Sequence, residues 1–346
     1  MLQKLYTRIE RLAAERPVLL AFWVFVAALL IVIPISMPFY IGQTHTFWMN
    51  VVAEAHGTVF DLLIIGWFLL WLNKIAERRL RNGRYREEID DYLGWKSPEA
   101  THRIVGNVRR LNRGGTREKL RLTEAFLAGA NLSGSHLRES DLWGAVLESA
   151  VLRDADLTGS NLAGADLDGA DLERARLIGA DMRGCALKEA DLERAVLDEA
   201  DLRGAMLNGA DLQYASLRQT NLNRSSLQGA NLRAAILEGT NLSGANLRGA
   251  NLRGAVLTGA DLRLAELDRT DFLGANLTDA ILPEDAPDLI RLFAPVKTLF
   301  GARFSPGIDR VLFEARPALF EMAHSAPTWQ ERAQPEPAAE PEPAAS

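Results

Sequence analysis

The chain of 346 residues carries a net charge of -6, and 48% of its residues are hydrophobic. A charge of this size is too small to indicate, by itself, a nucleic-acid partner or an acidic substrate. The single cysteine, Cys185, excludes an intramolecular disulfide and any metal site made of several cysteines. We expect a reducing environment, and the chain has no P-loop, G-x-S-x-G motif or zinc-ligand spacing to predict a cofactor, a metal or an enzyme.

The first predicted element is a transmembrane helix near residues 18–37, within a membrane anchor that covers residues 1–76. Its sequence, VLLAFWVFVAALLIVIPISM, contains no charged residue. At a rise of about 1.5 Å per residue, a helix of this length spans about 30 Å, which is the thickness of the hydrocarbon layer. A cleaved secretory signal is the alternative, because basic residues precede the run. The apolar run is long, however, and no A-x-A-like cleavage site follows it.

A second transmembrane helix is predicted near residues 51–72, although its first half contains ionisable residues. Four polar residues recur at spacings that place them on one helical face: Asn50, Glu54, Thr58 and Asp61. Ionisable groups inside a membrane are costly and are candidates for function. They favour either structural pairing within the hairpin or an oligomer, or a transport or sensing element that uses Glu54 and Asp61. A metal site formed by Glu54 with His45 and His56 has no ligand spacing to support it.

Basic residues after the second span indicate its orientation. They are Lys74, Arg78, Arg79, Arg81, Arg84 and Arg86. Basic residues also precede the first span, whereas residues 39–50 contain no Lys or Arg. The positive-inside rule therefore places both termini, and everything after about residue 74, in the cytoplasm. The six basic side chains are predicted to contact anionic lipid headgroups, which makes the lipid bilayer the first expected partner.

Residues 77–120 are interpreted as a basic juxtamembrane segment followed by N-terminal capping helices. Residues 86–95 predict a second short helix that is joined to the span. The next helix begins with Ser97 as its N-cap and Pro98 in its first turn, and two glycines, Gly114 and Gly115, end it. Its apolar side consists of Ile104, Val105, Val108 and Leu111. Because the end of a repeat domain exposes apolar side chains, this helix is expected to cover the start of the repeats that follow.

Residues 121–282 repeat with a period of five. From residue 127 to residue 282 every fifth residue is Leu, except Met182 and Phe272, and the residue two positions earlier is always Ala, Ser, Thr or Cys. On an α-helix a step of five rotates successive leucines by about 140°, and on a strand it sends them to opposite faces. The leucines can share one interior only if the chain bends in every pentapeptide. The spacing therefore predicts a closed, bent solenoid.

The sequence GTNLSGANLRGANLRGAVLTGADL, which begins at Gly239, resembles the pentapeptide-repeat family, whose pattern is A-(D/N)-L-x-x. The resemblance covers residues 125–282. It implies a β-solenoid, namely a right-handed quadrilateral β-helix with four repeats in each coil, and a location at the bacterial inner membrane. Some family members are similar to duplex DNA in shape and charge and protect topoisomerases. The resemblance therefore also implies a DNA mimic as an alternative function.

The residue before each leucine is predicted to point outward. Asp or Asn occupies it at ten-residue intervals, so two opposite sides of a four-sided rod would carry Asp/Asn columns. We interpret these side chains chiefly as hydrogen-bond acceptors for the backbone at the bends, with an acidic recognition strip as the alternative. On another side, Val196, Ile236 and Val256 would share one column. They predict a docking strip for a protein partner or a second copy, unless they are ordinary apolar surface.

Residues 283–323 are interpreted as C-terminal capping helices, near residues 287–300 and 306–321. The remaining residues, 324–346, are rich in Pro, Ala and Glu and are expected to be disordered. Within the repeats, Cys185 occupies a position that is otherwise small, so it is interpreted as a buried substitute for Ala.

The preferred functional hypothesis is a non-enzymatic, membrane-anchored scaffold whose rigid cytoplasmic rod binds an unidentified protein or forms a homo-oligomer. A DNA mimic that acts on a topoisomerase is disfavoured, because residues 121–200 carry 16 acidic and 8 basic residues whereas residues 201–282 carry 8 of each. A membrane anchor would also limit access to the chromosome, so nucleic acid is not an expected partner. The transport or sensing element is the third hypothesis. An enzyme is the least favoured, because continuous packing of small residues predicts no pocket.

Overall fold

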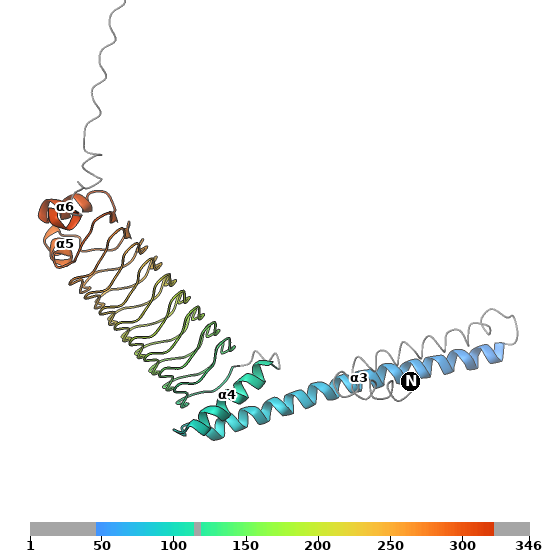
Figure 1. Cartoon of the computed structure of the whole chain (residues 1–346). Helices are drawn as coiled ribbons and strands as arrows, with labels where there is room; N and C mark the ends of the chain where they lie inside the picture. Colours follow the sequence, from blue (N-terminus) through green and yellow to red (C-terminus); the bar gives the residue numbers. More distant parts are fainter. Residues whose placement is uncertain (1–45, 114–118, 322–346) are drawn as a thin grey trace, which may run out of the picture. The chain divides into compact units, whose positions relative to one another are not determined.

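The computed structural model describes residues 46–113 and 119–321, with side chains from residue 64 onward (Figure 1). The chain forms two compact units, Met1–Arg84 and Tyr85–Ser346. The repeats and both of their capped ends belong to the second unit. The predicted span at residues 18–37 and the tail at residues 324–346 lie outside the described residues.

Helix α3 spans Thr46–Tyr92, a length of 47 residues. The helix predicted at residues 86–95, joined to the span near residues 51–72, is not a second helix, because α3 continues without a break to Tyr92. No proline lies between the two segments, and Gly83 lowers helix stability by only about 1 kcal/mol. In the part of the chain that the structure describes, no helix is both long enough and apolar enough to cross a membrane. The predicted transmembrane hairpin is not supported by these residues.

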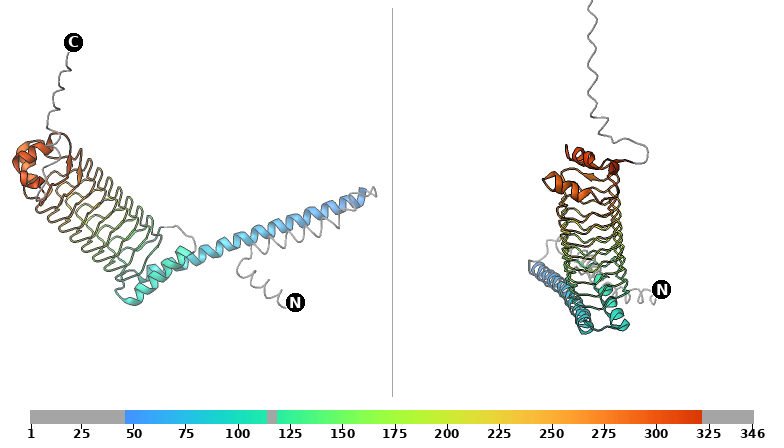
Figure 2. Two further views of the ribbon diagram at one scale, coloured as in Figure 1. Left: turned by 45° about the horizontal axis from the view of Figure 1, so that its top comes forward. Right: turned by 90° about the vertical axis from the view of Figure 1, so that its left-hand side faces the viewer.

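Helix α4 spans Pro98–Arg113 and covers the first coil of the repeats (Figure 2). The Ser97 hydroxyl oxygen accepts a hydrogen bond from the N–H of Ala100 at 3.2 Å, which caps the helix start. Two side chains of the helix form hydrogen bonds with backbone carbonyl oxygens of the rod. Thr101 Oγ1 donates to the carbonyl oxygen of Phe126 at 2.9 Å, and Arg109 donates to that of Asn131 at 2.9 Å. The buried residues of α4 are Ala100, Thr101, Ile104, Val105, Asn107, Val108 and Leu111.

Residues 121–281 form a stack of coils (Figures 1 and 2). From the bridge of Arg121 with Asp141 to that of Asp261 with Ile281, every fifth residue pairs in parallel with the residue twenty positions later. Twenty residues make one coil of four pentapeptides, so the predicted β-helix with four repeats per coil is confirmed. Every central residue from Leu122 to Leu282 is at most 8% exposed. The right-handed sense stays a prediction from the resemblance.

A tight turn closes each pentapeptide. In the first one, the N–H of Ala125 donates to the carbonyl oxygen of Leu122 at 3.1 Å, and the third residue of the turn, Glu124, has a φ of 54°. Every fifth residue from Glu124 to Asp279 has a φ between 53° and 69°. A positive φ at the third residue is the property of a type II turn, and it explains why glycine is frequent there.

The C-terminal end departs from the repeat. Helix α5 spans Ala286–Phe293, and helix α6 spans Ile308–Ala315. Between them strand β2, Arg303–Phe304, pairs in parallel with strand β1, Asn276–Leu277. A short 3-10 helix, η1, spans Pro317–Phe320.

The predicted C-terminal helices, at residues 287–300 and 306–321, are both too long. Each observed helix ends two residues before a proline, Pro295 after α5 and Pro317 after α6. Proline has no N–H to donate to a helix. Arg316, which precedes Pro317, lies outside the helical region, whereas Ala294, which precedes Pro295, keeps helical backbone angles. The side chain of Phe293, which is 0% exposed, closes the interior of the last coil.

Candidate interaction surfaces of the rod

The outward residues just before the leucines form four columns, one on each side of the rod. We number the sides by their first residue: side 1 begins at Arg121, side 2 at Phe126, side 3 at Asn131 and side 4 at His136. Consecutive members of a column are joined by the backbone bridges between coils, which in parallel sheets lie about 4.8 Å apart. Sides 1 and 3 are opposite and carry the Asp/Asn columns.

The side chains of the Asp/Asn columns bind the backbone of their own turns. Asp201 Oδ1 accepts a hydrogen bond from the N–H of Arg203 at 3.2 Å, and Asn241 Oδ1 accepts one from the N–H of Ser243 at 3.0 Å. Every Asp and Asn in the columns of sides 1 and 3 makes this bond to the residue two positions later. The predicted backbone role is confirmed, and it explains why the two residue types interchange.

Arginine neutralises much of the acidic charge on side 1. Asp181, Asp201 and Asp261 each pair with the arginine two residues later, at 2.6, 2.6 and 2.7 Å. The hydrogen bond from the arginine side chain lowers the pKa of each of these carboxyls below its usual value. Side 1 therefore presents closed ion pairs, which disfavours its interpretation as an acidic recognition strip.

The residues of the predicted docking strip lie together on side 4. Val196, Ile236 and Val256 are joined in one column by bridges that pass through Ser216. All four side chains are half-buried. Next to them, Ser216 Oγ donates to Asp198 Oδ1 at 2.6 Å, and Arg218 pairs with Glu238 at 3.0 Å. The column is thus an apolar band, interrupted by one hydroxyl and bordered by charged groups, and its role in docking stays a prediction.

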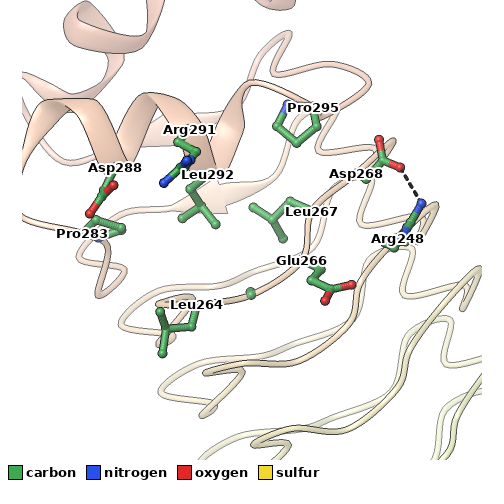
Figure 3. Close-up of a pocket in the computed structure, with 11 residues that line it drawn as sticks. Arg248, Leu264, Glu266, Leu267, Asp268, Pro283, Asp288, Arg291, Leu292 and Pro295 are labelled. Carbon is green, nitrogen blue, oxygen red and sulfur yellow. Dashed lines mark hydrogen bonds and ion pairs between the residues drawn. The ribbon is translucent and has the colours of Figure 1, made fainter.

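A pocket lies at the C-terminal end of the rod, where the sequence predicted none (Figure 3). Its volume is about 570 Å³. Leu264, Glu266 and Leu267 of the last coil line one wall (Figure 3). Asp288, Arg291 and Leu292 of α5 line the other (Figure 3). The prediction failed because continuous small-residue packing holds only within the coils, and α5 does not continue the repeat.

The repeat region matches a known family model. The description of that model is "Pentapeptide repeats", and its copies match residues from 120 to 282. The chain belongs to the pentapeptide-repeat family through these residues.

Solved structures of other proteins are similar to this chain, among them the pentapeptide-repeat proteins HetL and Rfr23. HetL of the cyanobacterium Nostoc sp. strain PCC 7120, involved in heterocyst differentiation regulation, is 36% identical over 51% of this chain and 94% of its own, with a TM-score of 0.29. QnrB1, a plasmid-mediated fluoroquinolone resistance protein in a trypsin-treated form, is 22% identical over 54% and 91%, with a TM-score of 0.40. Rfr23 of the cyanobacterium Cyanothece 51142 is 30% identical over 33% and 85%, with a TM-score of 0.24. No curated protein matches the chain.

The pentapeptide-repeat rod also exposes large apolar side chains that the sequence interpretation missed. Trp143, Tyr214 and Leu264 are 48%, 47% and 83% exposed. They lie one or two residues after a leucine, where most repeats carry Gly, a small residue or a charged one. A comparison of the turn positions across all repeats would have found them. The guanidinium of Arg194 lies 5.4 Å from the ring centre of Tyr214, so this tyrosine already has a cationic contact.

The polar face predicted inside the membrane lies on the first part of helix α3. Asn50, Glu54, Thr58 and Asp61 are helical residues, but their side chains lie outside the described part of the chain. The candidate lipid-contacting residues are described. Lys74, Arg78, Arg79, Arg81 and Arg84 are exposed, whereas Arg86 is half-buried.

An apolar segment precedes these basic residues on α3. Between Ile64 and Leu72 every residue except Gly66 is a large apolar residue, and each is between 40% and 58% exposed. A contiguous exposed apolar surface of this extent is typical of a site that contacts another protein or a membrane.

Cys185 has no sign of chemical activity. It is 0% exposed at a small-residue position, and burial raises the pKa of its thiol to about 12. The predicted substitution for Ala is consistent with both observations, because a buried, protonated thiol behaves as a small apolar group. Among the described residues, no group of three or more His, Cys, Asp or Glu side chains could hold a metal ion.

Proposed function

We propose that this protein is a non-enzymatic scaffold and that side 4 of its pentapeptide-repeat rod binds a partner protein. The observation that carries the proposal is the column of Val196, Ile236 and Val256. Backbone bridges between coils hold these side chains in a fixed row, so they are preorganised for binding. The ion pair of Arg218 with Glu238 lies beside the row and would form part of a polar rim.

The experiment is a comparison of two arginine substitutions on opposite sides of the rod. The full chain would be crosslinked in its native cell and the partners identified by mass spectrometry. Val256→Arg on side 4 should remove the main partner, because a charged side chain cannot enter an apolar interface without a counter-ion. Val146→Arg on side 2 is the matched control and should leave it bound. Equal capture by both variants and the parent chain would reject side 4 as the docking surface.

The proposal includes attachment of the N-terminal region to a lipid bilayer. Two features support it: the uncharged run at residues 18–37, and the exposed apolar segment from Ile64 to Leu72. Exposed basic residues from Lys74 to Arg84 follow that segment directly and complement the charge of anionic headgroups. The expected location is the bacterial inner membrane, with the termini and the rod in the cytoplasm.

Membrane attachment can be tested by fractionation. The full chain should sediment with membranes and stay there after extraction at alkaline pH, whereas a chain that begins at residue 85 should be found in the supernatant. A full chain released by alkaline extraction would contradict attachment through an apolar segment. Protease protection of the rod in sealed vesicles of known orientation would decide on which side it lies.

The results of two further measurements could favour another function over that of a scaffold. Inhibition of DNA supercoiling by the rod would favour a DNA mimic that acts on a topoisomerase, although the closed ion pairs of side 1 argue against it. Ion flux into vesicles that disappears in Asp61→Asn or Glu54→Gln would favour a transport or sensing element.

A further inference from the structure

The last coil of the rod is continued on three of its four sides. On side 1 Asp261 pairs with Ile281, on side 3 Asp271 pairs with Thr298, and on side 4 Asn276 of β1 pairs with Arg303 of β2. On side 2 Asn246 pairs with Glu266, and among the described residues no bridge follows it. The residue twenty positions after Glu266 is Ala286, where helix α5 begins. The helix therefore replaces the strand that would have continued side 2.

This replacement leaves three backbone groups of the last coil without a partner in the described part of the chain. They are the N–H of Leu264, the carbonyl oxygen of Ala265 and the N–H of Leu267. One coil earlier, the equivalent groups of Gly244, Ala245 and Leu247 bond the coil above at 3.0, 2.9 and 2.8 Å. The gap is limited on its far side, because the N–H of Arg269 donates to the carbonyl oxygen of Pro295 at 2.8 Å.

The unpaired groups belong to residues that line the 570 Å³ pocket (Figure 3). A volume of this size is typical of sites that enclose a small ligand or a few residues of a peptide. Ala265 is 8% exposed, whereas Ala245 in the coil below is 0% exposed, so the space above Ala265 is open. Leu264, Leu267 and Leu292 give the pocket an apolar lining.

The charged groups at the pocket favour a cationic occupant. Glu266 is exposed, and no ion pair of it or of Asp288 occurs among the described residues. Asp268 is already paired with Arg248 at 3.1 Å. Arg291, the other basic residue of the lining, has no ion pair among the described residues, so two unpaired carboxylates stand against one unpaired guanidinium. A side chain that stood above Glu266 would lie about 4.8 Å from it, at the spacing of neighbouring strands.

We call the gap above Leu264, Ala265 and Leu267 on side 2 the slot. We propose that the slot binds an extended peptide segment of a partner protein, which adds the missing strand of side 2. The segment has a small residue followed by Lys or Arg. The N–H of the basic residue donates to Ala265, its carbonyl oxygen accepts from the N–H of Leu267, and the carbonyl three residues earlier accepts from the N–H of Leu264. These bonds reproduce those of the coil below, and the basic side chain pairs with Glu266.

The proposal names a class of partner for one end of the rod, and it rests on the proposed scaffold function only because it requires a partner protein. The slot and the docking strip occupy different sides, so the Val256→Arg comparison does not affect it. Failure of the parent chain to bind the peptide, while it still captures its side 4 partner, would reject this proposal alone.

The first test uses amide hydrogen exchange in the full chain without added peptide. The N–H of Leu267 should exchange faster than the N–H of Leu247, which is bonded to the carbonyl oxygen of Glu266. Equal protection of both would mean that the chain itself fills the slot, which would overturn the proposal.

The second test measures binding of the labelled peptide acetyl-Arg-Leu-Ala-Lys-Leu-Asp-amide, which copies residues 263–268 with Lys in place of Glu266. Methylation of the backbone nitrogen of its Lys should weaken binding about tenfold, because it removes the hydrogen bond to the carbonyl oxygen of Ala265. Glu266→Lys should weaken binding by a similar factor, and a peptide with Glu in place of Lys should recover it. Glu189→Lys, a charge reversal at another exposed glutamate, is the matched control and should bind like the parent chain.

Two results would overturn the slot as a strand-addition site. One is equal binding of the methylated and unmethylated peptides, which would show that no backbone pairing occurs. The other is equal loss of binding in Glu189→Lys and Glu266→Lys, which would show attraction to the net charge of the rod alone. Slower exchange of Leu267 on addition of the peptide is the positive result in the parent chain.

Discussion

The coils of the rod and its C-terminal end use different means to close the same four-sided interior. In the coils, interchangeable leucines fill the interior, and the backbone bonds repeat every twenty residues. At the end, the ring centre of Phe293 lies 6.0 Å from that of Phe272 and 5.6 Å from that of Phe304. The coils therefore depend on a pattern, whereas the end depends on particular side chains.

The ion pairs of the coils also differ from those of the C-terminal end, in their exposure and in their number of partners. Within the coils, most ion pairs are exposed and join neighbours in one turn or the next coil. At the end, Asp271 is 4% exposed and pairs with both Arg253 and Lys297. Burial raises the pKa of the Asp271 carboxyl, but the hydrogen bonds of Lys297, Leu273 and Arg253 outweigh burial and lower the pKa.

The largest expected effect is the introduction of a charge inside a coil. Leu192 is 0% exposed, so Leu192→Asp would bury a carboxylate without a counter-ion, which costs several kcal/mol. We expect the β-helix to lose its cooperative thermal unfolding, as measured by circular dichroism. Leu264→Asp is the matched control at an 83% exposed leucine, and it should unfold like the parent chain. A stable Leu192→Asp rod would contradict the closed interior.

The next effect tests whether the end is as firmly packed as the coils. Phe293→Ala should lower the free energy of unfolding by about 3–5 kcal/mol, because it leaves a cavity between two other aromatic rings. Denaturant titration of the full chain measures the loss. Leu292→Ala, on the half-buried side of α5, should cost clearly less. If both variants lose less than about 1 kcal/mol, the end does not contribute to the stability of the rod.

A smaller effect concerns the turns. Gly254 has a φ of 66° and no neighbouring atom within 4 Å of a Cβ placed there, so Gly254→Ala adds backbone strain without a clash. We expect it to lower the free energy of unfolding by about 1 kcal/mol. Ala234 has a φ of 54° at the equivalent position, so Ala234→Gly should be neutral or stabilising. The same sign for both substitutions would show that the positive φ is not what selects glycine.

The smallest effect is the acid dependence of the side 1 ion pairs. The hydrogen bond from Arg203 lowers the pKa of Asp201, so the pair stabilises the fold fully above the unfolded pKa near 3.8. That contribution is lost as the pH falls through the folded pKa, which lies lower still. Asp201→Asn should reduce the acid-dependent loss of stability by at most about 1 kcal/mol, since the pair is partly exposed. Thermal unfolding between about pH 5 and pH 2 measures the difference, and an unchanged slope would contradict the pairing.

The sequence predicted the coils well, because their physics is local and periodic. A leucine every five residues requires a bend in each pentapeptide, and the small residue at Ala125 and its equivalents shows which other position points inward. The backbone role of the Asp/Asn columns followed from known turn chemistry. The column of Val196, Ile236 and Val256 followed from the twenty-residue coil, which came from the family resemblance.

The sequence could not predict the ends to the same degree. One continuous helix from Thr46 to Tyr92 replaced two predicted segments, because apolar and charged stretches are equally compatible with an unbroken helix. The slot on side 2 escaped prediction as well. It depends on where the chain leaves the coil after Leu282 and returns at Pro295, and no periodic signal marks that path. Tyr214 and Trp143 were missed because the search for outward-pointing apolar residues covered only the position before each leucine.

The twenty-residue coil has a consequence for changes in the length of the rod. Insertion or deletion of a whole coil would lengthen or shorten the stack and keep every column on its own side. Insertion of a single pentapeptide would instead turn everything after it by one quarter of a revolution, so the C-terminal slot would move from the side 2 column of the earlier coils to an adjacent side. The number of residues between the docking strip and the slot therefore fixes the angle between them about the rod axis, in quarter turns for every five residues.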